Sequence, residues 1–145
     1  MFHTIVVATD GSTHGSRAMD LAREMALGGD HTLVIVHVIE VVGGKGGMVP
    51  LLPDEERLRA NLEAEAADLC AAGIKTTVLT PAVRASGPAH AISEAADNVG
   101  ADVIVVGRRG HSAVGEVILG GVPVRLMQIA RCPVLVVPPA HGTDS

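Results

Sequence analysis

Residues 102–110, DVIVVGRRG, are the stretch that decides the fold of this 145-residue chain. Four β-branched apolar residues follow one another without alternation, and a glycine turn ends the run. Residues 3–9 (HTIVVAT) and 32–38 (TLVIVHV) have the same character. Strands that are apolar on both faces are typical of a parallel sheet covered by helices on both sides. The sequence therefore predicts an α/β fold.

In the rest of the chain, segments whose apolar residues are spaced as on one face of a helix alternate with further apolar runs. We expect helices at 12–27, 53–73, 86–100 and 122–130, and strands at 75–80 and 133–137. Because parallel strands are joined by right-handed crossovers that carry helices, this order predicts a doubly wound parallel sheet of five strands with four helices. No linker interrupts the composition, so we expect one domain over 1–145 with a frayed tail at 138–145. The glycine-rich residues 43–52 (GGKGGMVPLL) are expected to form a loop.

The composition excludes several classes of function. Apolar residues make up 48% of the chain and charged residues 19%, which is typical of a globular protein. Phe2 is the one aromatic residue, so the chain lacks rings on which bases or flavins could stack. The net charge of −5 disfavours nucleic acids and anionic membranes as partners. No apolar run reaches the ~18–20 residues that a membrane span needs.

The reactive side chains indicate neither a metal centre nor an efficient enzyme. Cys70 and Cys132 form no disulfide framework and no signal peptide precedes them, which predicts a cytoplasmic protein with both cysteines as small core residues. The seven histidines lack the paired spacing of metal ligands, and His37 is expected to be a buried, hydrogen-bonded residue of its strand. No nucleophile and base can be paired by spacing, so we expect no efficient catalysis.

Two turns at strand ends are candidate binding sites, because ligands of open α/β sheets bind beyond the carboxyl ends of the strands. In the first, Ala8-Thr9-Asp10, the Asp10 carboxylate could accept hydrogen bonds from a ribose hydroxyl or an adenine amine. It could equally cap the helix that follows.

The second turn runs from Gly107 to Gly121. Its glycines allow a close backbone approach, and the helix start after Gly120-Gly121 offers free N–H groups to a phosphate. Arg108, Arg109 and His111 concentrate positive charge there. A long surface loop is the alternative, although loops of this length in small domains are usually functional.

The glycine spacing G-x2-G-x9-G, set between a strand ending VVG and the strand CPVLVV, resembles that of the universal stress protein family. The resemblance extends over the whole chain through VVATDGS, LVIVHVIE, GPAHAISEAADNVGADVIVVGRRGH and ARCPVLVVP. It implies an adenine nucleotide alpha hydrolase-like fold and a cytoplasmic homodimer in stress response or signalling. It also implies ATP between the first and fourth strands of the predicted sheet, with at most slow ATP hydrolysis if magnesium joins the triphosphate.

The resemblance assigns roles to individual residues. Asp10 would contact the adenosine, Ala8 and Thr9 would line the base pocket, and Val38 would offer backbone groups to adenine. The phosphate end would be formed by Gly107, Gly110, Gly120, Gly121 and Val122. Arg109 and His111 join this set of candidates because of the positive charge that they bring to the turn.

Gly121 and Pro123 depart from the pattern of ATP-binding members, which carry hydroxyl side chains at these positions. Each hydrogen bond to a charged group contributes about 1.5–3 kcal/mol. A dimeric interaction protein that binds no nucleotide is therefore the alternative function.

The last predicted strand carries four apolar residues at an expected sheet edge: Val134, Leu135, Val136 and Val137. An exposed apolar edge invites association. We therefore expect a homodimer paired through this strand.

Overall fold

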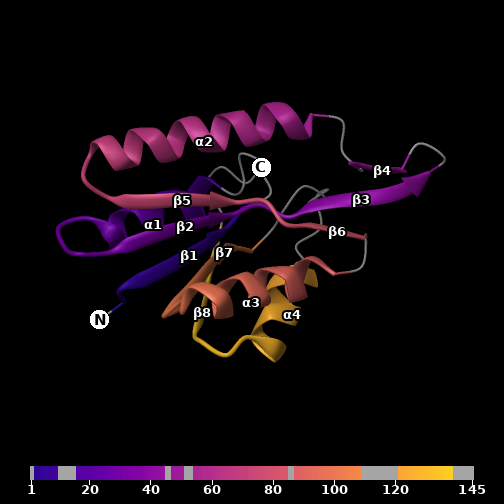
Figure 1. Ribbon diagram of the computed structural model, residues 1–145. Helices are drawn as coiled ribbons and strands as arrows, with labels where there is room; N and C mark the ends of the chain where they lie inside the picture. The colour runs from indigo at the N-terminus through magenta and orange to yellow at the C-terminus, as the bar shows by residue number, and fades with distance from the viewer. Residues whose placement is uncertain are drawn as a thin grey trace.

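The computed structural model of the chain describes residues 2–9, 16–44, 47–50, 54–84, 87–108 and 121–138. Within these residues, five parallel strands form a sheet in the order β5-β2-β1-β7-β8 (Figure 1). The strands are β1 (Thr4–Ala8), β2 (Thr32–Val36), β5 (Lys75–Leu79), β7 (Val103–Gly107) and β8 (Val134–Val137). The helices of the same part are α1 (Ser16–Ala26), α2 (Glu55–Ala71), α3 (Pro88–Val99) and α4 (Gly121–Ile129). The predicted five-stranded, doubly wound sheet with four helices is confirmed.

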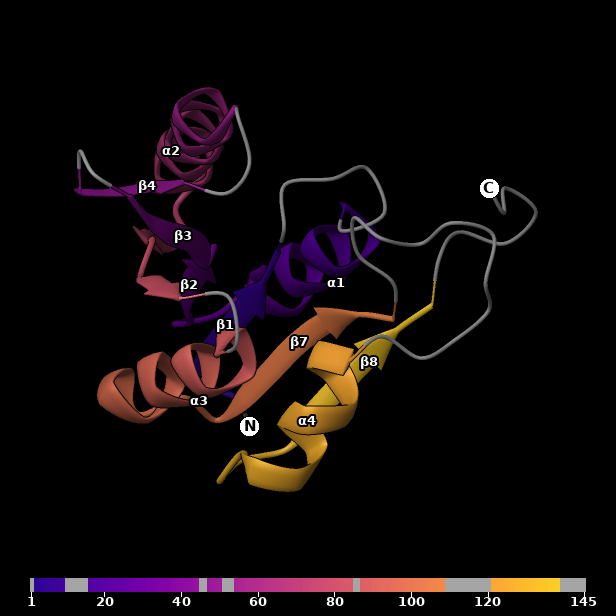
Figure 2. The same ribbon diagram turned by 90° about the vertical axis from the view of Figure 1, so that its right-hand side faces the viewer.

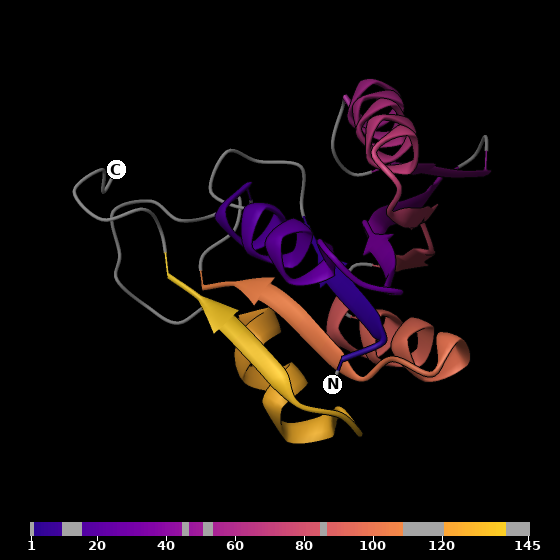
Figure 3. The same cartoon turned by 90° about the vertical axis from the view of Figure 1, so that its left-hand side faces the viewer.

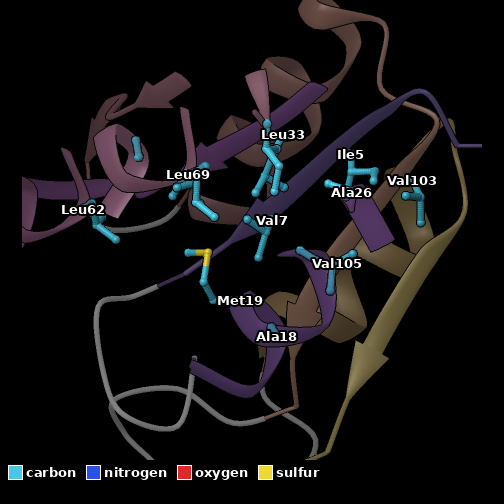
Figure 4. Close-up of a cluster of buried hydrophobic side chains, with 14 of the residues drawn as sticks. Ile5, Val7, Ala18, Met19, Ala26, Leu33, Leu62, Leu69, Val103 and Val105 are labelled. Atoms are coloured by element: carbon cyan, nitrogen blue, oxygen red, sulfur yellow. The ribbon is translucent and has the colours of Figure 1, made fainter. Parts of the chain in front are cut away.

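Different helices cover the two faces of the sheet. Helices α1 and α2 lie on one side, and α3 and α4 lie on the other (Figure 3). Side chains alternate along each strand, so Ile5 and Val7 of β1 join the first cluster while Val6 and Ala8 join the second. Figure 4 shows side chains from α1, α2 and the strands β1, β2 and β7 meeting in the first cluster.

A smaller sheet occupies part of the stretch that the sequence predicts as a loop. Strand β3 (Ile39–Gly44) pairs antiparallel with β4 (Gly47–Pro50) and parallel with β6 (Ala82–Arg84). The loop prediction for 43–52 is therefore wrong for residues 43–44 and 47–50, while 45–46 and 51–52 lie outside the described residues. The reason is that glycine also serves antiparallel pairing: Gly47 begins β4 with φ +107°, which L side chains rarely adopt.

Cys70 is exposed, and its prediction as a core residue is wrong. Helix α2 buries Leu62, Ala66 and Leu69. Each residue turns by about 100° around a helix, so Cys70 leaves the buried stripe that Leu69 occupies. Cys132 is half-buried against the second cluster, and this burial, with the nearby carboxylates of Asp97 and Asp102, raises the pKa of its thiol.

Asp102 joins the beginning of β1 to the beginning of β7. Its Oδ2 accepts hydrogen bonds from the backbone N–H groups of His3 and Thr4, each at 2.9 Å. The bond from Thr4 is the main cause that lowers the pKa of the Asp102 carboxyl group, and the bond from His3 acts in the same direction. Because the folded pKa lies below the unfolded value of about 3.9, the charged carboxylate stabilises the fold above that pH. The contribution is lost as the pH falls through the folded pKa.

We expect Asp102→Asn to lower the melting temperature at pH 7, and the difference from the wild type to narrow as the pH falls below about 4. Asparagine keeps an acceptor for the two N–H groups but has no charge to lose. Thermal unfolding over this pH range measures the effect, with Asp68→Asn on the exposed face of α2 as the control. A difference that stays equal at pH 7 and pH 3 would contradict this account of Asp102.

Candidate functional site

The strand order reverses between β1 and β7, and their carboxyl ends lie side by side. Ala8 pairs with Val106, which precedes Gly107. On the other side of β1, Ala8 pairs with Val36, and the Thr9 N–H donates to the Val36 carbonyl at 3.0 Å. The predicted switch point is thus the place where β1, β2 and β7 end together.

The backbone of Val38 is directed toward the extension of β1. The N–H groups of its neighbours donate in the opposite direction: His37 to the Leu79 carbonyl at 2.9 Å, and Ile39 to the Pro81 carbonyl at 2.8 Å. Successive residues of an extended chain direct their backbone groups to opposite sides, so the Val38 N–H and C=O face the space beyond the end of β1. The position agrees with a backbone contact to a ligand at the switch point.

Helix α4 begins at the same edge of the sheet. Figure 2 shows it starting beside the carboxyl ends of β7 and β8 and running back toward their beginnings. The first N–H groups of a helix have no partner within it, which leaves those of Gly121 and Val122 available for an anion. Pro123 is buried and has no N–H, so the first turn offers one donor fewer.

The described part of the chain brings six of the predicted site residues to this edge: Ala8, Thr9, Val38, Gly107, Gly121 and Val122. The other five lie outside the described residues: Asp10, Arg109, Gly110, His111 and Gly120. Arg108, which follows Gly107, is half-buried, and its N–H donates to the Val137 carbonyl at 2.9 Å. The phosphate-binding roles of these residues stay predictions.

A buried pair of polar side chains lies behind the ends of β1 and β2. His37 is 1% exposed and Glu55 4%, and the distance from His37 Nε2 to Glu55 Oε1 is 2.6 Å. His37 Nδ1 lies 3.0 Å from the carbonyl oxygen of Thr9. His37 is therefore the buried, hydrogen-bonded histidine that the sequence predicts, although it follows β2 rather than lying within it.

Glu55 was not predicted as part of the site. Acidic residues are favoured in the first turn of a helix, which explains Glu55 without any further role. The spacing of residues along α2 nevertheless indicates that Glu55 is buried. Glu55 lies seven residues before Leu62, on the stripe that continues with Ala66 and Leu69. A carboxylate on a buried stripe indicates a buried partner.

Two further observations concern the described residues alone. No helix among them is both long enough and apolar enough to cross a membrane. Their His, Cys, Asp and Glu side chains also form no group of three or more that could hold a metal ion.

A doubly wound sheet whose strand order reverses beside the start of a helix defines an α/β protein with a candidate binding edge at its switch point. The model of the universal stress protein family matches residues 1–138, and the chain belongs to that family. The resemblance seen in the sequence is thereby confirmed.

Individual relatives agree over nearly the whole chain. The universal stress protein in the QAH/OAS sulfhydrylase 3′ region of Thermus aquaticus is 39% identical over 139 residues, which cover 94% of this chain and 99% of the relative. A universal stress protein solved in complex with cAMP is 29% identical, with a TM-score of 0.65 and coverage of 96% and 98%. The universal stress protein of Archaeoglobus fulgidus solved in complex with dAMP is 26% identical, with a TM-score of 0.65 and coverage of 93% and 97%.

Proposed function

We propose that this chain binds an adenine nucleotide, ATP among them, at the edge of the sheet between β1 and β7. The observation that carries the proposal is the convergence of three strand ends and the start of α4 at the switch point. The solved relatives in complex with cAMP and dAMP support the adenine nucleotide as the class of ligand.

The two ends of the nucleotide would meet different parts of this edge. Ala8, Thr9 and Val38 lie where the base would be held, with Asp10 beside the ribose. The first turn of α4 lies where backbone N–H groups would meet phosphates, and Arg109 and His111 would add positive charge. Magnesium would join a bound triphosphate. The nucleotide would be held rather than turned over efficiently, and the protein would act in stress response or signalling in the cytoplasm.

A second candidate is a dimeric interaction protein without a nucleotide. Gly121 and Pro123 favour it, because the first turn of α4 lacks two hydroxyl groups and one N–H. Titrations with ATP, AMP and cAMP, followed by thermal shift and calorimetry, separate the two functions. A ligand present at 100 times its Kd raises the free energy of unfolding by about 2.7 kcal/mol. Absence of any shift or heat with all three ligands would favour the second candidate.

Asp10→Ala is expected to weaken adenosine binding by roughly 10- to 100-fold. This corresponds to the loss of a hydrogen bond to a charged group, about 1.5–3 kcal/mol. Calorimetry measures the affinity, and the melting temperature of the free protein reports on the fold. Asp68→Ala, an exposed carboxylate on α2, serves as the matched control. Equal affinities of Asp10→Ala and wild type would rule out the assigned role.

Gly121→Ser is expected to tighten ATP binding by about tenfold or more and to leave adenosine binding unchanged, because the added hydroxyl would face the phosphates. A Cβ at Gly121 meets no atom within 4 Å, and its φ is not in the left-handed region. Pro123 is kept in this test since its side chain is buried.

Gly87→Ser provides the matched control, because Gly87 is the N-cap residue of α3 and also has open space around a Cβ. It is expected to leave ATP affinity unchanged. An equal gain with adenosine in Gly121→Ser, or no gain with ATP in a variant that melts normally, would place the phosphates elsewhere.

We also propose that the chain forms a homodimer through β8. The sheet order puts β8 at an edge, as predicted, and Leu135 of this strand is 39% exposed. Val134 and Val136 pack against the second cluster, and Val137 is buried in the first. Leu135 is thus the apolar side chain of β8 that a partner would cover.

Leu135→Lys is expected to convert the dimer to a monomer at micromolar concentration, because pairing would bury the new charge without a partner. Light scattering measures the mass. Leu27→Lys, which places the same charge at an exposed leucine following α1, is the control and should leave the dimer intact. A monomeric wild type, or a dimer that persists in Leu135→Lys, would overturn the proposed interface.

A further inference from the structure

The pair formed by His37 and Glu55 is held by hydrogen bonds to two other elements. The His37 ring contacts the carbonyl of Thr9 at the end of β1 and the carboxyl group of Glu55 at the start of α2. The backbone N–H of His37 donates to the carbonyl of Leu79 at the end of β5. One buried residue thus connects β1, β5 and α2 at the edge where the nucleotide is proposed to bind.

The hydrogen-bond partners of His37 determine which of its ring nitrogens carries a hydrogen. A carbonyl oxygen can only accept, so His37 Nδ1 carries a hydrogen and donates it to Thr9. The 2.6 Å contact between Nε2 and Glu55 Oε1 needs one further proton, which either the ring or the carboxyl group can carry. Both arrangements have the same net charge and hold the ring in the same orientation. Glu55 therefore fixes the ring that donates to Thr9.

Thr9 is held through both of its backbone polar groups. Its N–H donates to the Val36 carbonyl at 3.0 Å, and its C=O accepts from His37 Nδ1 at 3.0 Å. Val36 and His37 are consecutive residues at the end of β2, and Val38 follows them. The two contacts therefore set the distance between Thr9 and Val38, which are the residues proposed to meet the base.

We propose that His37, oriented by Glu55, is a positioning residue for the adenine end of the nucleotide site. It does not touch the ligand itself: it fixes the carbonyl of Thr9 and with it the spacing between the ends of β1 and β2. This inference rests on the proposed nucleotide binding. It also gives Glu55, the first residue of α2, an indirect role in the affinity for adenosine. Helix α2 contributes no residue to the predicted site.

Two substitutions at His37 separate the contact with Thr9 from the contact with Glu55. The side-chain amide nitrogen of asparagine matches Nδ1 of histidine, so His37→Asn keeps a donor for Thr9. That of glutamine matches Nε2, so His37→Gln keeps a donor for Glu55 and loses the one for Thr9. We expect His37→Asn to bind adenosine within about threefold of the wild type, and His37→Gln to bind at least tenfold more weakly.

Two substitutions at Glu55 test the orientation of the ring. Glu55→Gln can donate its amide N–H to Nε2 of a neutral His37 and is expected to keep wild-type affinity. Glu55→Leu offers no polar partner and is expected to lose tenfold or more. Thr76→Val is the control for lost stability, because the buried Thr76 hydroxyl donates to the Ile74 carbonyl at 2.8 Å, at the opposite end of the sheet. It is expected to melt earlier and to bind normally.

Calorimetry with adenosine and amide hydrogen exchange at Thr9 are measured for every variant. Exchange at Thr9 needs no ligand: its N–H should exchange faster in His37→Gln than in His37→Asn or Thr76→Val. If the wild type binds adenosine and His37→Gln binds it equally well, the positioning role is wrong while the proposed function stands. If the wild type binds no adenine ligand, the proposed function fails. In that case the amide exchange rate of Thr9 tests whether His37 holds the end of β1. Equal exchange rates in His37→Asn and His37→Gln would show that it does not.

Discussion

The burial of β1 and β7 on both faces is the constraint on which the rest of the structure depends. Ile5, Val6 and Val7 are each fully buried, and so are Ile104 and Val105. Full burial of one such side chain contributes about 1.5–3 kcal/mol, so neither face of these strands can be left in water. Two helices on each side satisfy this requirement, and the doubly wound order of the chain follows from it.

The closeness of α1 to the sheet depends on small side chains. Ala18, Ala22 and Ala26 recur at every fourth position of α1 and are almost completely buried. A larger residue on this stripe would push the helix away or force strained rotamers, which costs about 1–3 kcal/mol. The single aromatic residue, Phe2, packs at the margin of this cluster rather than within it. The close packing of α1 on the sheet thus explains why this part of the core is built from small and aliphatic side chains rather than aromatic ones.

A sheet covered on both faces leaves the ends of its strands as the place for polar chemistry. All five strands of the main sheet run in parallel, so their carboxyl ends meet at one edge. The buried His37–Glu55 pair lies at this edge, where Thr9 supplies a carbonyl that a purely aliphatic core could not satisfy. We therefore regard the pair as part of the edge where the nucleotide is proposed to bind rather than of the core. Its proposed role is to hold backbone groups in place.

The sequence by itself determined the five strands of the main sheet, the four helices and the edge at which the switch point lies. Continuous apolar runs such as 102–106 report full burial, and Gly100 ends α3 in the left-handed conformation that its position indicates. Only the tertiary structure decided that β3 leaves the main sheet to pair with β4 and β6, and that Glu55 contacts His37 from 18 positions away. The physical reason is that the apolar pattern of a segment reflects how much of its surface is buried on folding. The partner of a buried polar group depends instead on which distant segments the completed sheet brings to the same edge.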